Sequence, residues 1–128
     1  MARLRLRSRC AASALAGVFG ALPQLARAGE ADVVAARAVC AEGVCRFFVT
    51  VRHADAGWEH YADRYEVLAP DGSVLATRVL QHPHVDEQPV TRGLDGVRIP
   101  DGIARVRVRA NDLVHGYGGA EASVEIPG

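Results

Sequence analysis

From Asp32 onward, apolar and polar residues alternate along the chain, and turn residues interrupt the alternation every eight to twelve positions. A period of two places successive side chains on opposite faces of an extended strand. No stretch of this region shows sustained helical periodicity. Short strands separated by regularly spaced turns are typical of all-β sandwiches. We therefore expect a seven-stranded antiparallel β-sandwich of the immunoglobulin or fibronectin type.

The alternation also predicts where each strand lies and which side chains it buries. In the second strand, Phe47, Val49 and Val51 share one face, and the same count places His53 at the inward-facing end. The predicted strands cover residues 33–40, 44–53, 61–69, 73–80, 90–99, 103–112 and 120–126.

The first 28 residues have the three-part plan of a secretory signal peptide. Four alternating arginines precede an apolar run over residues 10–25, and Ala26-Arg27-Ala28 forms a small-residue cleavage site. The apolar run is shorter than the roughly 20 residues of a membrane-spanning helix, so we expect cleavage rather than anchoring. Cys10 follows Arg7-Ser8-Arg9 rather than small apolar residues, so lipid attachment there is not expected. The prediction is a signal peptide over 1–28 and one periplasmic or secreted domain over 29–128, with no membrane association after cleavage.

The net charge of the predicted domain argues against two classes of binding partner. Loss of the leader leaves ten arginines against fifteen carboxylates, and lysine is absent from the chain. An acidic protein is a poor partner for nucleic acid or anionic lipid, because both bind net positive surfaces. Arg105, Arg107 and Arg109 do share one face of the sixth strand, but glutamates occupy the outward faces of other strands. We expect cross-strand ion pairs there rather than nucleic-acid contacts.

The predicted domain contains two cysteines, Cys40 and Cys45, separated by four residues that include a glycine. In an oxidising compartment such a pair indicates a disulfide across a tight hairpin. A zinc site is the alternative, but structural zinc needs four ligands at closer paired spacing.

All five histidines lie in or beside the three longer predicted connections. In an antiparallel chain with short connections, alternate connections lie at opposite ends, so these three share one end and the three short turns share the other. Imidazole and carboxylate groups together are ligands for zinc, copper(II), nickel or ferrous iron, and we expect zinc or copper(II). The candidate ligands, histidines first in order of preference, are His82, His84, His53, His115, His60, Asp63, Asp112 and Asp86.

Other functions stay open at this point. The histidines could have structural roles, as a stiff His-Pro-His turn or a hydrogen-bonded core group. The same loops could bind a protein or glycan through Trp58 and Tyr117, since loop aromatics are frequent interface anchors, or these two rings could close the end of the sandwich. A metalloenzyme fits the ligand inventory, but no nucleophile motif or triad spacing indicates a reaction. The metal-binding hypothesis implies storage, delivery or resistance.

Three segments resemble an uncharacterised family of small exported proteobacterial β-sandwich proteins. They begin at His53, His82 and His115 and read HADAGWEHYADR, HPHVDEQP and HGYGG. The resemblance covers most of the predicted domain. It implies export and implies no activity.

Overall fold

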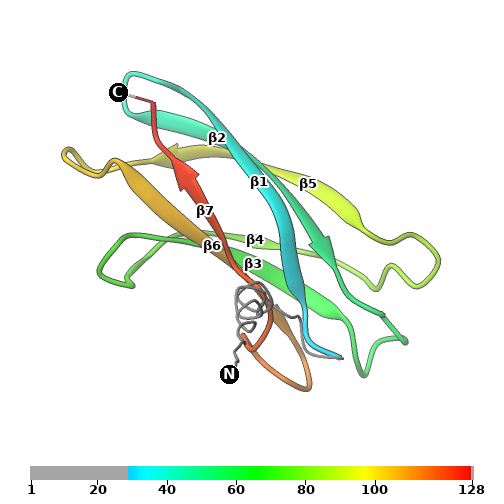
Figure 1. Cartoon of the computed structure of the whole chain (residues 1–128). Coiled ribbons are helices and arrows are strands. Elements are labelled where there is room, and N and C mark those ends of the chain that lie inside the picture. The colour runs from blue at the N-terminus through cyan, green and yellow to red at the C-terminus, as the bar shows by residue number, and fades with distance from the viewer. Residues whose placement is uncertain (1–28, 128) are drawn as a thin grey trace, which may run out of the picture.

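The computed structural model describes residues 29–127, which form two antiparallel sheets packed face to face (Figure 1). The predicted leader therefore lies outside the described residues. The all-β sandwich is confirmed, while the immunoglobulin or fibronectin type stays a prediction. The strands are β1 (Asp32–Ala41), β2 (Val44–Arg52), β3 (Ala62–Leu68), β4 (Val74–Val79), β5 (Val90–Arg98), β6 (Arg105–Asp112) and β7 (Ala122–Glu125).

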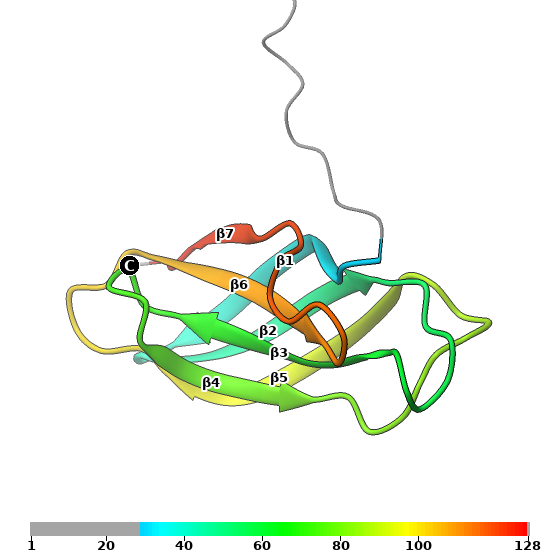
Figure 2. The same ribbon diagram turned by 90° about the horizontal axis from the view of Figure 1, so that it is seen from below.

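One sheet has the order β1-β2-β5 and the other has the order β4-β3-β6-β7. The chain changes sheet after β2, after β4 and after β5. It reverses direction at each connection, so the connections alternate between the two ends of the sandwich. Figure 2 shows the two layers with the connections at either end. Within the described residues, no helix is long and apolar enough to cross a bilayer.

Alternating apolar side chains of both sheets fill the core. Phe47 and Val49 of β2 are fully buried and Val51 is 2% exposed, as the alternation predicts. They join Tyr65 and Val67 of β3 in one buried cluster. Complete burial of side chains of this size contributes about 1.5–3 kcal/mol each, so this face holds the two sheets together.

The alternation of β3 is interrupted near its start. The pairing of β3 with β6 shifts register between Ala62 and Arg64, which is a β-bulge or similar irregularity. Ala62 is consequently the buried residue, with 3% exposure, and Asp63 is only partly buried. A count by twos back from Tyr65 and Val67 predicts that Asp63 lies on the inward face. That prediction is wrong, because the irregular register interrupts the alternation.

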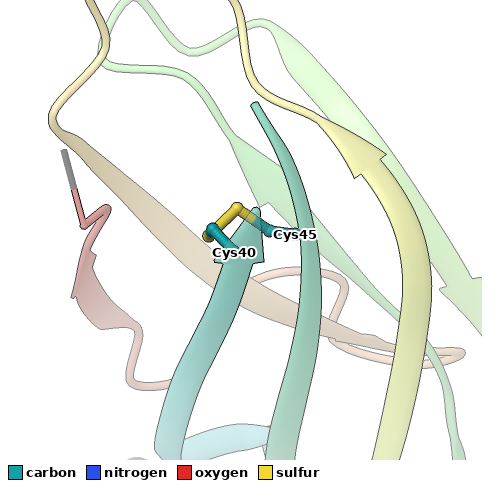
Figure 3. The surroundings of a disulfide bond; sticks show 2 residues. All are labelled: Cys40 and Cys45. Atoms are coloured by element: carbon teal, nitrogen blue, oxygen red, sulfur yellow. A yellow bond between two sulfur atoms is a disulfide. The ribbon is translucent and has the colours of Figure 1, made fainter. Parts of the chain in front are cut away.

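The short turns gather at one end, and a disulfide closes the first of them. Glu42 and Gly43 both have positive φ, at 55° and 80°, as in the two-residue turns that match the twist of a β-hairpin. Directly beside this turn, Cys40 pairs with Cys45 across the two strands. Their sulfurs are bonded, which confirms the predicted pairing (Figure 3).

The arginines of β6 pair with glutamates that lie in neighbouring strands or directly before one. Arg105 contacts Glu125, Arg107 Nη1 is 2.7 Å from Glu121, and Arg109 Nη2 is 2.9 Å from Glu66. These contacts are the cross-strand ion pairs expected from the sequence.

Candidate metal centre

Four titratable side chains meet at the end of the sandwich that carries the longer connections. His53 directly follows β2 and His60 lies near the end of the β2–β3 connection. Asp112 is the last residue of β6, and His115 follows it in the β6–β7 connection. Side chains alternate between the two faces along β2 and β6. This alternation places His53 and Asp112 on the inward faces, where both side chains are 0% exposed. The predicted gathering of histidines at one end is thus present for two of the three longer connections.

His53, His60 and Asp112 lie close together. One potential ligand atom from each lies within 4.8 Å of the other two. The Nε2 atoms of His53 and His60 are 3.2 Å apart. An oxygen of Asp112 lies 3.6 Å from Nε2 of His53, and the other lies 3.4 Å from Nε2 of His60. Two ligands bound tetrahedrally at about 2.0–2.1 Å from zinc are about 3.3 Å apart. The separation of the two imidazole nitrogens is close to this value, and each of them has a different oxygen of Asp112 at a similar distance.

Asp55 fixes the orientation of the His53 ring from behind. Its Oδ1 is 2.6 Å from Nδ1 of His53, and it also accepts the backbone N–H of Ala62 at 3.0 Å. Its Oδ2 accepts the backbone N–H of His84 at 2.7 Å. A carboxylate on one ring nitrogen directs the other ring nitrogen, here Nε2, toward a metal.

Asp112 is held as an anion by its surroundings. Burial by itself would raise the pKa of its carboxyl, but two backbone N–H groups and nearby imidazoles lower the pKa below its ordinary value. The N–H groups of Val114 and His115 donate to Oδ1 at 2.8 and 2.7 Å. The charged form is the one that binds a cation.

His115 and the start of the described chain complete the surroundings. Nδ1 of His115 lies 3.2 and 3.3 Å from the two oxygens of Asp112, and its ring centroid is 5.0 Å from that of His60. The carbonyl oxygen of Gly29 is 3.0 Å from Nε2 of His53. The side chains of His60 and His115 are 26% and 34% exposed, so the group is reachable from solvent.

His82 and His84, the first two candidates from the sequence, contribute no ring nitrogen to this group. Their rings lie against each other with centroids 4.5 Å apart. Nδ1 of His82 is 3.0 Å from the carbonyl of Pro83, and the guanidinium of Arg92 lies 3.1 Å from Nε2 of His84. Burial and the charge of Arg92 lower the pKa of His84. The role of His84 at the centre is instead its backbone N–H, which holds Asp55.

The carboxylates Asp63 and Asp86 also lie outside the group. Asp63 accepts hydrogen bonds from Asn111 at 2.6 Å and from Arg64 at 2.8 Å. Asp86 is exposed.

The two loop aromatics have different surroundings. Trp58 is 63% exposed and makes an edge contact with Tyr61, so it does not close the end of the sandwich. Tyr117 packs under Arg109, whose Cζ is 3.9 Å from the ring centroid, and its hydroxyl accepts a 2.8 Å hydrogen bond from Arg64. Tyr117 is therefore held by contacts within the protein, whereas most of the Trp58 ring is exposed to solvent.

Sequence reasoning did not assign roles to two residues that position the centre. Gln88 accepts the backbone N–H of His53 at 3.0 Å and donates to the carbonyl of His84 at 2.9 Å, which joins two connections. The role of Asp55 could have been predicted from the sequence, because a carboxylate two residues after a strand-end histidine can reach its ring. The role of Gln88 could not, since its hydrogen-bond partners are 35 and 4 residues away in the sequence.

Comparison with known proteins adds one relative. A protein of Halomicrobium mukohataei described as "Putative lipoprotein" is 38% identical over 97 residues, which is 75% of this chain and 47% of that protein. The chain thus spans about half the length of the curated relative it matches. No protein-family model matches the chain, and no solved structure matches it. A lipoprotein is an exported protein, and in this respect the description of the relative agrees with the leader expected here.

Proposed function

We propose that this chain is an exported, periplasmic or secreted protein that binds one divalent transition-metal ion through His53, His60 and Asp112. The observation that carries the proposal is the convergence of these three donor atoms from the β2–β3 connection and from the end of β6. His115 is the candidate fourth ligand, because its Nδ1 lies beside both oxygens of Asp112. Export is supported by the leader-like first 28 residues and by the similarity to a lipoprotein.

A cation accounts for the arrangement better than hydrogen bonds alone. Nε2 of His53 faces the carbonyl of Gly29, Nε2 of His60 and a carboxylate oxygen of Asp112. The carbonyl and carboxylate oxygens offer lone pairs, and Nε2 of His60 offers one in the tautomer that has its proton on Nδ1. A proton on Nε2 of His53 can serve only one of these three acceptors well. One metal ion accepts electron pairs from several such atoms at once.

The donor set favours zinc or copper(II). Two imidazoles and a carboxylate suit these borderline ions. Both cysteines of the described chain are in the disulfide, so they offer no thiolate to a softer ion. Solvent access at His60 and His115 suits an ion that is taken up and released, as storage, delivery or resistance requires.

Elemental analysis of the exported protein tests the proposal. We expect about one zinc or copper per chain, removable by dialysis against a chelator and restored by adding the ion. His60→Ala should weaken the affinity by at least tenfold, because it removes a ligand. His53→Ala should do the same, and since His53 is buried, its folding must be checked by circular dichroism.

His82→Ala is the matched control, because it removes an exposed imidazole at the same end and should leave the affinity unchanged. Metal-free protein with no titratable affinity for zinc or copper(II) would refute the proposal. An equal loss in the His60 and His82 variants would show that the site is elsewhere.

A second candidate function is recognition of a protein or glycan by the same loops. The 63% exposure of Trp58 favours it, because a large exposed ring beside polar groups is a common interface anchor. Under this alternative, Trp58→Ala weakens capture of a partner and chelators have no effect. Chelator-sensitive capture would count against it.

A further inference from the structure

Gly29 is both the residue after the expected cleavage site and a neighbour of the metal centre. Its carbonyl oxygen lies 3.0 Å from Nε2 of His53. A Cβ built on Gly29 would lie 2.9 Å from Cε1 of His115, so the backbone of Gly29 is close to the rings of two separate histidines. The residue links the predicted processing of the chain with the site.

Glycine is the residue that this position accepts. The φ angle of Gly29 is +89°, a conformation that residues with a side chain rarely adopt. The 2.9 Å approach to the His115 ring leaves no room for a Cβ unless the ring moves. The lack of a side chain therefore lets the backbone approach the imidazoles without displacing the His115 ring.

The chain that follows Gly29 is anchored to the rest of the fold. Ala31 is fully buried, and the backbone N–H of Val33 donates to the carbonyl of Ala120 at 2.8 Å. Asp32 accepts the N–H of Ala120 at 2.7 Å. Figure 2 shows this blue start of β1 beside the orange connection that leads to β7. These contacts hold Gly29 at the centre, unlike the loose end of many domains.

We propose that removal of the leader after Ala28 makes Gly29 a metal ligand through its new α-amino nitrogen and its carbonyl oxygen. The inference rests on the proposed metal-binding function. Hydrolysis of the Ala28–Gly29 peptide bond leaves a carboxylate on Ala28 and an amine on Gly29. The nitrogen and a Cβ on the same Cα are about 2.5 Å apart, so that nitrogen lies within about 5.4 Å of Cε1 of His115. An amine and a carbonyl on one residue can bind the same ion in a five-membered chelate ring.

In this arrangement the unprocessed precursor has an amide at Gly29, whose nitrogen is a poor ligand. Only the processed protein has the amine. High-affinity metal binding is thereby restricted to protein that has been exported and cleaved.

The absence of lysine allows a direct test. When the leader is removed, the α-amino group is the sole primary amine of the polypeptide, so an amine-reactive N-hydroxysuccinimide ester reports on the terminus alone. The full chain is expressed with its own leader, and intact mass defines the terminus of the exported product. With zinc as the probe, we expect labelling to slow by about tenfold or more when one equivalent is bound.

Two variants separate a ligand role from general stabilisation. Insertion of Ala-Ser between Ala28 and Gly29 displaces the amine, so zinc should bind roughly tenfold more weakly and should not protect the amine. The same dipeptide added after Gly128 is the matched control and should change neither property.

The outcomes distinguish this inference from the function on which it rests. If zinc binds and labelling is unaffected, the amine is not a ligand, and the metal-binding function stands. If exported protein retains residues before Gly29, the inference is also overturned. If zinc does not bind at all, the proposed function itself fails.

Discussion

At the scale of single residues, Asp55 connects the metal centre to the fold. Its carboxylate contacts Nδ1 of His53 at 2.6 Å and accepts two backbone N–H groups. Asp55→Asn replaces one of these acceptor oxygens with an N–H donor and removes the charge that fixes the His53 tautomer. Loss of such a supporting carboxylate lowers metal affinity by about 10–100-fold.

Competition against a chelator of known affinity measures this change. Asp86→Asn is the control, because Asp86 is an exposed carboxylate outside the group. Unchanged affinity in the Asp55 variant would mean that His53 is held by other contacts, or that it is not a ligand.

Tyr65 provides a prediction about stability and pH. Its buried hydroxyl donates to the carbonyl of Arg92 at 2.9 Å, and burial raises its pKa to about 12. Between pH about 10 and 12, the unfolded chain loses this proton while the folded chain keeps it. The stability contributed by the raised pKa is complete below pH about 10 and is lost as the pH rises through about 12.

Tyr65→Phe removes the ionisation as well as the hydrogen bond. We expect a loss of about 1 kcal/mol in the free energy of unfolding at neutral pH and a smaller alkaline decline than in the parent protein. Urea unfolding at several pH values measures both. A variant with the same alkaline decline as the parent would show that other groups control it.

Residue-scale detail is also where sequence reasoning was weakest. The sequence places His82 and His84 first among the candidate ligands, but it does not reveal that Arg92 lies against one ring nitrogen of His84. That contact depends on loop conformation and on a side chain of another strand. His53 and Asp112 were easier to place, because strand alternation fixes the face on which each lies.

At the scale of elements, the strands were predictable because the alternation and the turn residues are both local signals. Every observed strand lies within two residues of its expected bounds. The irregularity near Ala62 was not predictable, because it depends on how β3 pairs with a strand more than 40 residues later in the sequence. Its effect was to place Ala62 in the core and Asp63 at the periphery.

The β1–β2 hairpin gives a prediction that separates stability from metal binding. Cys40 and Cys45 close a very small loop, for which the chain-entropy estimate is about 2 kcal/mol of stabilisation. The double variant Cys40→Ala, Cys45→Ala should lose up to this amount in chemical unfolding. Its affinity for zinc should not change, because β2 carries Cys45 and His53 to its opposite ends, roughly 26 Å apart.

A change in zinc affinity in the double variant would contradict this separation. The hairpin turn itself should persist, since Glu42 and Gly43 already adopt the conformation that a two-residue turn requires.

At the scale of the whole molecule, a bound ion would join parts of the chain that are distant in sequence. His53 follows β2 in one sheet, whereas His60 precedes β3 and Asp112 ends β6 in the other sheet. Because the donors converge only in the folded state, binding stabilises that state by about 2.7 kcal/mol at a free ion concentration 100 times the Kd. We expect the Tm to rise by on the order of 10 °C.

Calorimetry with and without zinc measures the shift, and His60→Ala should abolish most of it. If Tm does not change although zinc is bound, the ion binds the unfolded chain equally well. The grouping of all histidines at one end was predictable from the alternation of connections. The choice among them was not, because it depends on how the ends of two sheets pack together.

The position of Trp58 has a practical consequence. It is the chain's single tryptophan, it lies within the connection flanked by His53 and His60, and most of its surface faces solvent. Its emission is therefore an intrinsic optical probe of events at this end of the protein. Copper(II), which is paramagnetic, should quench the indole fluorescence, whereas closed-shell zinc should leave its intensity nearly intact, so one titration without an added dye can tell the two ions apart.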